Sequence, residues 1–191
     1  MSAGAALRKR KTGRATYRDV LNAPPHMVAE IVEGALHTQP RPAMPHALAG
    51  SSLGDELVSP FQKGRGGPGG WWIIDEPELH LGEDILVPDL AGWRRERMPE
   101  YPETPYCTLA PDWVCEILSP STQKFDLEQK RPVYAREGVG HLWLVDPAAR
   151  VLETFALLKG DWSPAGSARN DDPVSFPPFE AIAFPLDALW P

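Results

Sequence analysis

Residues 112–146, DWVCEILSPSTQKFDLEQKRPVYAREGVGHLWLVD, are the stretch that decides the fold. The apolar run at 112–118 predicts a strand that is buried on both faces. Residues 122–137 predict a helix that ends at Gly138, because glycine readily adopts the left-handed conformation that closes a helix. Residues 141–146 predict a second buried strand. This order of strand, helix and strand predicts an α/β domain.

The segments on either side add further strands and helices. On the C-terminal side, residues 151–158 predict a hairpin partner for the strand at 141–146, and the proline-rich tail predicts only a last strand near 181–184. On the N-terminal side the predicted elements are a helix at 16–21 capped by Thr16, a strand at 29–39 with Gly34 at a hairpin or bulge, a helix from Pro45 to about 59, and strands at 71–81 and 85–93. Leu48, Leu53 and Leu57 lie on one side of the second helix and predict its buried face. The glycine-rich segment 63–70 lacks the Gly-Lys-Ser/Thr ending of a phosphate-binding loop, so we interpret it as a connector.

The composition is that of a globular protein of ordinary domain size. The chain has 191 residues, of which 42% are hydrophobic and 24% charged, so we expect one domain over residues 16–191. No apolar run approaches the roughly 20 residues that span a bilayer, and the N-terminus lacks the apolar stretch of a secretory signal, so we expect no contact with membranes. The two cysteines, Cys107 and Cys115, match no zinc pattern and are too few for a disulfide framework. A reducing cytoplasm is the expected location.

The net charge of -7 is unevenly distributed along the chain. Five of the 19 basic residues lie before residue 15, and no acidic residue precedes Asp19. We interpret residues 1–15 as a disordered basic arm. The rest of the chain carries 14 basic and 26 acidic residues, a net charge of -12, which does not attract the phosphate backbone of nucleic acid as a whole. The arm favours such a contact, although short basic tails are usually only solvated.

Two carboxylates, Asp89 and Glu116, lie within apolar segments. Burying an unpaired carboxylate costs several kcal/mol, so each needs a partner, a proton or a metal. Two carboxylates on adjacent strands repel each other when both are ionised, unless the pKa of one rises or a cation lies between them. Oxygen ligands suit a hard cation such as Mg²⁺ or Mn²⁺. The pair therefore predicts a divalent-metal site, and the alternative is that each carboxylate has a separate structural partner.

A set of short motifs follows in order along residues 17–155. The motifs are AEIVEG at 29–34, VPD at 87–89, EILSPST at 116–122, Asp126 with Lys130 and Tyr134, and GV at 138–139 leading to WLVDP at 143–147. Together they resemble the Uma2 family of putative restriction endonucleases, which is placed in the PD-(D/E)XK nuclease superfamily. The resemblance implies an α/β fold with a restriction-endonuclease-like core, in which a central mixed β-sheet is flanked by helices in the order αβββαβ.

The resemblance also implies a reaction, which is metal-dependent hydrolysis of phosphodiester bonds in nucleic acid, with DNA as the expected substrate. Asp89 would be the first carboxylate and Glu116 the second, and both would bind Mg²⁺ or Mn²⁺. The superfamily has a lysine two residues after the second acid, where this chain has Leu118. The family pattern instead implies Lys130 in the following helix, which would stabilise developing negative charge or orient the attacking water. A homodimer is the implied assembly.

Two further acids are implied as supporting residues of the site. Glu30 matches an early glutamate of the family, and Asp126 lies one helical turn before Lys130, where it can steer the ammonium group. The alternative for Lys130 is a solvent-exposed helix lysine paired with Asp126. His46, where the family often has a histidine, is interpreted as a capping or packing residue.

Two other functions remain open on the sequence alone. A binding or scaffolding module on a nuclease fold, with degraded catalysis, is favoured by the acidic body, by the lysine missing from the strand and by Pro132. That proline removes a hydrogen bond from the predicted helix and so changes the direction in which Lys130 points. A hydrolase that uses two carboxylates on a glycoside ranks last, because no aromatic platform for a sugar is evident.

Overall fold

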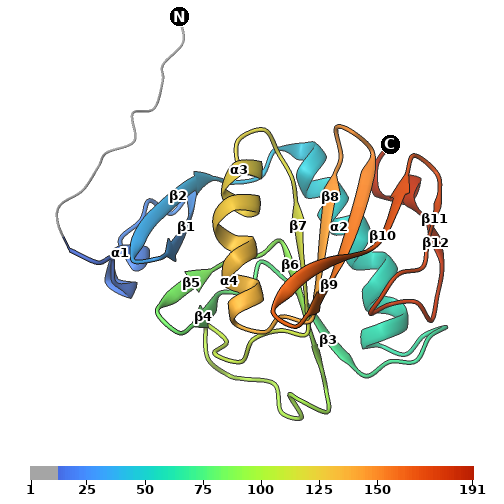
Figure 1. Cartoon of the computed structure of the whole chain (residues 1–191), viewed down its shortest axis with the longest axis horizontal. Helices are drawn as coiled ribbons and strands as arrows, with labels where there is room; N and C mark the ends of the chain where they lie inside the picture. Colours follow the sequence, from blue (N-terminus) through green and yellow to red (C-terminus); the bar gives the residue numbers. More distant parts are fainter. Residues whose placement is uncertain (1–12) are drawn as a thin grey trace, which may run out of the picture.

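A six-stranded mixed β-sheet forms the centre of the protein, whose computed structural model describes residues 13–191 (Figure 1). Its strand order is β10-β9-β8-β7-β6-β3, and only β7 and β8 are parallel neighbours. The strands are β3 Trp71–Asp75, β6 Leu90–Arg94, β7 Trp113–Ile117, β8 His141–Asp146, β9 Val151–Leu158 and β10 Asp161–Arg169. Residues 1–12, and with them most of the predicted basic arm, lie outside the described residues.

A four-stranded antiparallel sheet of order β2-β1-β5-β4 lies beside the central sheet. Its strands are β1 Met27–Val32, β2 Ala35–Pro40, β4 Leu79–Leu81 and β5 Asp84–Leu86, and a small third sheet pairs β11 Pro173–Val174 with β12 Phe184–Pro185. The turn between β1 and β2 holds Glu33 at φ 53° and Gly34 at φ 78°. Positive φ at both central residues is what a two-residue hairpin turn requires, so the predicted hairpin at Gly34 is confirmed.

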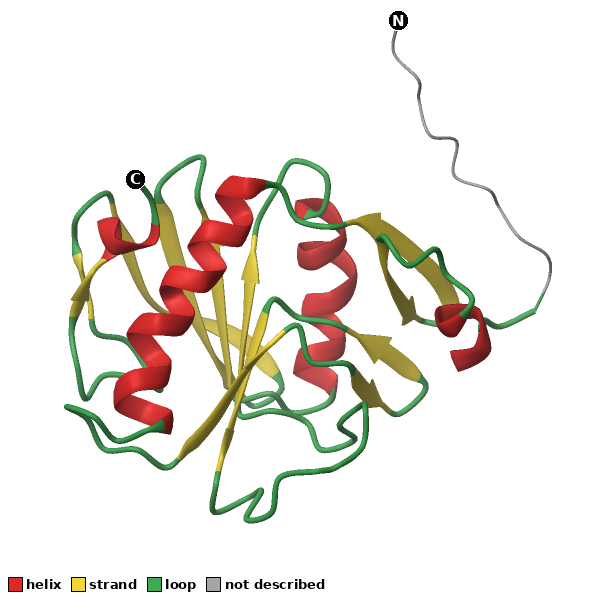
Figure 2. Ribbon diagram, turned by 180° about the vertical axis from the view of Figure 1, so that it is seen from behind, coloured by secondary structure: helices red, strands yellow, loops and turns green. Residues whose placement is uncertain are grey.

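Helices cover both faces of the central sheet. They are α1 Tyr17–Leu21, α2 Met44–Leu57 with a π-helical extension η1 Val58–Gln62, the consecutive segments α3 Gln123–Phe125, η2 Asp126–Lys130 and α4 Arg131–Arg136, and η3 Leu186–Leu189. On β7, Cys115 and Ile117 belong to the core cluster that contains Leu53 of α2, whereas Val114 belongs to the cluster that contains Val133 of α4. Since side chains alternate between the faces of a strand, α2 and the segment α3–α4 lie on opposite faces (Figures 1 and 2).

The observed architecture confirms the predicted fold class. Taking α2 as the first helix, the elements follow as α2, β3, β6, β7, the segment α3–α4, and β8, which is the expected order αβββαβ. The strands at 141–146 and 151–158 have the predicted bounds. None of the helices in residues 13–191 is long and apolar enough to cross a membrane. One domain over residues 16–191 stays a prediction.

Several predicted boundaries are wrong, each for a local reason. The predicted strand 71–81 is two strands in different sheets, because Glu76 adopts φ 43° and Pro77 follows it. The predicted strand 85–93 is divided into β5 and β6 by the segment 87–89. Leu48 is 43% exposed, and Ala49 takes its place in the core.

The strand β10 was not predicted, because the tail beyond Trp162 is rich in proline, which argues against a strand. It tolerates Pro164 at a register shift between Pro164 and Gly166, where the pairing with β9 is irregular. Proline in a sheet is confined to edges and bulges, and β10 is both the edge strand and the bulged one.

Candidate active site

A pocket of about 290 Å³ lies where the two main sheets meet. The end of β2, the start of α2, the segment 87–89, the end of β7 and the helix after it all contribute to its lining. Four of the predicted site residues line it, namely Asp89, Glu116, Asp126 and Lys130. The fifth, Glu30, contacts Lys130 from β1. The structure therefore brings together all five residues, although they come from segments up to 100 positions apart.

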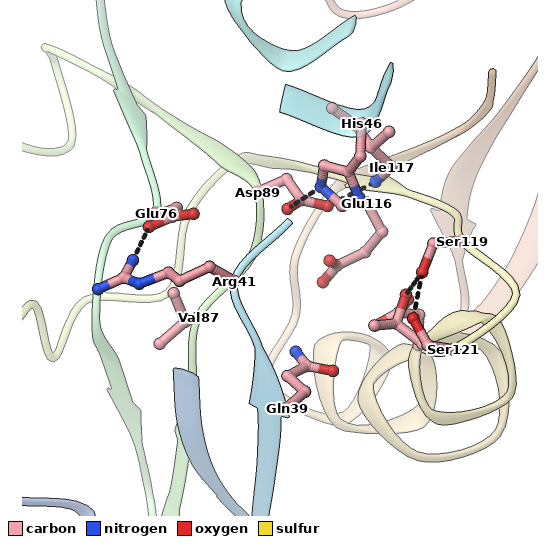
Figure 3. Close-up of polar contacts among 12 residues, drawn as sticks. Gln39, Arg41, His46, Glu76, Val87, Asp89, Glu116, Ile117, Ser119 and Ser121 are labelled. Carbon is pink, nitrogen blue, oxygen red and sulfur yellow. Dashed lines mark hydrogen bonds and ion pairs between the residues drawn. The ribbon is translucent and has the colours of Figure 1, made fainter. Parts of the chain in front are cut away.

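Asp89 is held at the start of β6 by contacts to two other elements (Figure 3). Its Oδ2 accepts a 2.6 Å hydrogen bond from the backbone N–H of Ile117, and its Oδ1 lies 2.7 Å from Nε2 of His46 on α2. The first contact ties Asp89 to the strand that carries Glu116. The interpretation of His46 as a capping or packing residue missed the second contact, and only its family position pointed to a role in the site.

Lys130 is the centre of a buried cluster of charges. Its Nζ lies 2.9 Å from Oε1 of Glu116, 3.2 Å from Oε1 of Glu30 and 3.6 Å from Oδ1 of Asp126, and it donates a 3.0 Å hydrogen bond to the carbonyl of Val87. The Lys130 side chain is only 1% exposed, so the alternative of a solvent-exposed helix lysine is wrong. An ammonium group has three donors, and four acceptors already surround this one.

Glu116 keeps one carboxylate oxygen open to the pocket. Its Oε1 accepts a 2.5 Å hydrogen bond from the hydroxyl of Tyr134 in addition to the contact with Lys130. Among the described residues, its Oε2 accepts no hydrogen bond. In Figure 3 the carboxylate of Glu116 projects from β7 into the space between the hairpin and the following helix. One oxygen is thus occupied by the protein, and the other is available to a ligand.

The helix that carries Lys130 departs from α geometry just before Pro132. A π-helical turn spans Asp126–Lys130, in which the backbone N–H of Arg131 bonds to the carbonyl of Asp126. The proline lies in the first turn of the α-helical segment that follows. The helix geometry is therefore altered near Pro132, yet Lys130 still points into the carboxylate cluster. A π turn inside a helix is frequently found at functional sites.

Glu30 links the β1–β2 hairpin to the rest of the site. Its Oε1 accepts a 2.8 Å hydrogen bond from the backbone N–H of Val87, and its Oε2 accepts a 3.1 Å bond from Nε2 of Gln39 on β2. The carbonyl of Val87 also accepts a hydrogen bond from Lys130. Both the N–H and the carbonyl of Val87 are therefore bound, which fixes the backbone just before Asp89.

The cluster holds protons more tightly than its members do in water. Burial raises the pKa of Glu116 well above its usual value, and the nearby Asp126 and Asp89 add to this effect. The pKa values of Glu30 and Asp126 are also raised, chiefly by burial. Burial opposes the charge of Lys130, but the carboxylates around it, Glu116 first, prevail and raise its pKa well above normal. Burial thus favours the protonated acids, and the carboxylates in turn favour the charged form of Lys130.

The carboxylates of the pocket suit a divalent cation that binds to few protein ligands. In residues 13–191, no three side chains of His, Cys, Asp or Glu converge as a ready-made metal centre. The ammonium of Lys130 contacts Glu30, Glu116 and Asp126, and the two predicted metal ligands, Asp89 and Glu116, both line the pocket. Mg²⁺ is usually bound through one or two carboxylates and keeps several waters, so two carboxylates match this ion.

The fold is that of a nuclease-like α/β protein. A solved structure described as a putative nuclease belonging to DUF820, from Anabaena variabilis ATCC 29413, superposes on the chain with a TM-score of 0.72. The similarity covers 92% of this chain and 97% of the other, at 21% sequence identity, and at this identity it establishes the fold.

The family assignment comes from the sequence as a whole. Residues 14–187 match the Uma2 family, which is described as putative restriction endonuclease. The chain therefore belongs to the Uma2 family, and the predicted resemblance is confirmed. No curated protein matches the chain.

Proposed function

We propose that the protein is a metal-dependent endonuclease that hydrolyses phosphodiester bonds of nucleic acid. One observation carries this proposal. Asp89 and Glu116 line one pocket, where each carboxylate keeps acceptor capacity that the described residues do not use. The match to a family of putative restriction endonucleases supports the substrate class. DNA as the substrate, a homodimer and a cytoplasmic location stay predictions.

In this proposal Asp89 and Glu116 hold Mg²⁺ or Mn²⁺. When bound, such an ion polarises the scissile phosphate and lowers the pKa of a coordinated water. Both oxygens of Asp89 accept one contact each from the protein, which leaves a lone pair on each. Glu116 contributes its open Oε2.

The remaining residues hold these two ligands in place. Lys130 neutralises part of the negative charge and fixes Oε1 of Glu116, so we assign it a positioning role instead of direct contact with a phosphate. Glu30 and Asp126 hold the ammonium from two other sides. His46 orients Asp89 through Oδ1. An outer shell of this kind sets the orientation and basicity of metal ligands.

The rival proposal is a scaffolding module on the same fold, and Lys130 weakens the case for it. The strand has Leu118 where a lysine is expected, but the buried Nζ of Lys130 lies 2.9 Å from Oε1 of Glu116. The acidic body still favours the rival, since it repels a polyanion.

The test combines metal binding with cleavage. At a Mn²⁺ concentration of about 100 times Kd, binding adds about 2.7 kcal/mol, which raises Tm by about 5–10 °C for a chain of this size. Asp89→Asn and Glu116→Gln should abolish this shift, whereas Glu153→Gln, at an exposed site on β9, should keep it. The parent should also nick supercoiled plasmid in Mn²⁺. Metal binding without cleavage of plasmid or single-stranded DNA would favour the scaffold, and an unchanged Tm would refute the metal site.

A further inference from the structure

Arg41 is the one basic residue of the pocket lining whose side chain is mostly exposed. The lining contains three basic residues, Arg41, His46 and Lys130. Lys130 is enclosed by carboxylates and His46 faces Asp89. The side chain of Arg41 is 57% exposed and contacts a single acid, Glu76, with 2.8 Å between Nη1 and Oε2.

The local sequence presents this guanidinium at the rim of the pocket. Arg41 follows the last residue of β2, Pro40, and precedes Pro42. A proline fixes its own φ and restricts the residue before it, so the backbone on both sides of Arg41 is stiff. A guanidinium has five N–H donors, and Glu76 takes one in the part of the chain that is described. The remaining donors form a planar fork, which matches a phosphate better than an ammonium does.

Glu76 is held in an unusual backbone conformation that connects Arg41 to Asp89. Its φ is 43°, a left-handed conformation that costs a residue with a side chain about 1–3 kcal/mol. Its backbone N–H donates a 3.0 Å hydrogen bond to the carbonyl of Asp89. Figure 3 shows the guanidinium of Arg41 turned towards Glu76, on the side of the pocket away from Glu116. Arg41 is thus anchored beside the carboxylate pair without pointing at it.

We propose that Arg41 binds a backbone phosphate of the nucleic acid next to the scissile one, and that Glu76 competes with that phosphate for the guanidinium. This inference rests on the proposed nuclease function. A polyanion that enters an acidic pocket needs positive charge on its path, and the Arg41 guanidinium supplies it at the rim.

Substitutions of Arg41 and of Glu76 should change KM in opposite directions, whereas loss of a merely structural ion pair would change KM in the same direction from either side. Arg41→Ala should raise KM for a short fluorescein-labelled DNA duplex in Mn²⁺ by about tenfold to a hundredfold, with little change in kcat. The slope of log Kd against log salt should fall by about one. Arg41→Lys should recover part of the loss. Glu76→Gln should lower KM, because the guanidinium is then free of its competitor.

Two controls separate this role from general charge and from folding. Arg169→Ala removes an equal charge from an exposed position on β10 and should leave KM unchanged. Glu76→Gln placed on Arg41→Ala should add no further change if Glu76 acts through Arg41. All variants should keep the Tm of the parent within a few degrees, since exposed ion pairs contribute little to stability.

Each result decides a different claim. A parent that cleaves the duplex, with Arg41→Ala equal to Arg169→Ala in KM, would overturn the role of Arg41 and leave the nuclease proposal intact. A rise of KM in both Arg41→Ala and Glu76→Gln would show a structural ion pair instead. A parent that neither binds nor cleaves the duplex would refute the proposed function and this inference with it.

Discussion

Replacing Lys130 by methionine should leave three buried carboxylates without their shared cation. The contact of 2.9 Å with Glu116 alone corresponds to about 6 kcal/mol of attraction at an effective dielectric constant of about 20. Burying the ammonium offsets much of this attraction, and removing one partner of a buried pair is measured to cost about 3–5 kcal/mol. For a chain of this size that loss lowers Tm by about 6–20 °C.

Urea or thermal unfolding of Lys130→Met at several pH values measures this loss. The loss should be large near pH 8, where the carboxylates must ionise, and should shrink towards pH 5 as they take up protons. Saturating Mn²⁺ should restore part of it, because the ion supplies the missing positive charge.

The matched control is Lys124→Met in the same helical segment. Lys124 is 84% exposed and lies 3.8 Å from Glu128, so its loss should change stability by less than about 0.5 kcal/mol. Equal stabilities of Lys130→Met and Lys124→Met at pH 8 would refute the buried cluster as described, since the three carboxylates would then have no need of Lys130.

Two further predictions concern the metal ligands. The pKa of Glu116 is raised by burial, so above its ordinary value of 4.5 the folded protein still holds a proton that the unfolded chain has released. Stability of the metal-free protein should therefore fall as pH rises from 4.5 towards the folded pKa of Glu116, and Glu116→Gln should flatten this decline; parallel pH profiles for parent and variant would contradict the direction of the shift. His46→Ala removes the contact that orients Asp89 and should weaken Mn²⁺ binding about tenfold to a hundredfold in calorimetric titration, with an unaltered affinity as the contrary result.

The strongly patterned parts of the fold were accessible from the sequence. Residues 141–146 and 151–158 are short runs rich in β-formers, separated by a turn, and both strands have the predicted bounds. The prediction of one strand at 71–81 was wrong because the apolar pattern continues past Glu76, where the chain leaves one sheet and enters another. Patterns of burial report which residues are inside, and they do not report to which sheet a residue belongs.

Asp89 and Glu116 were accessible as carboxylates within apolar segments, and the other residues of the site only as motif positions. The resemblance selected Asp89, Glu116 and Lys130, and the structure places them together. Their contacts were not predictable, because they depend on where β1 docks against the segment 87–89. Arg41 was not predicted for the same reason, because the acid that it contacts, Glu76, lies 35 residues away in the sequence.

The docking of the β1–β2 hairpin limits the lifetime of the whole site. Glu30 of the hairpin contacts Lys130, and Gln39 of the hairpin donates a hydrogen bond to Glu30. The hairpin also leads into Arg41 at the edge of the pocket. Proteins open locally in units such as hairpins, with free energies below that of global unfolding. Whenever this hairpin detaches, Lys130 loses one counter-charge and the pocket loses a wall in the same event. The geometry of the site therefore lasts only while the hairpin stays docked, and amide hydrogen exchange in residues 27–40 measures the free energy of its opening.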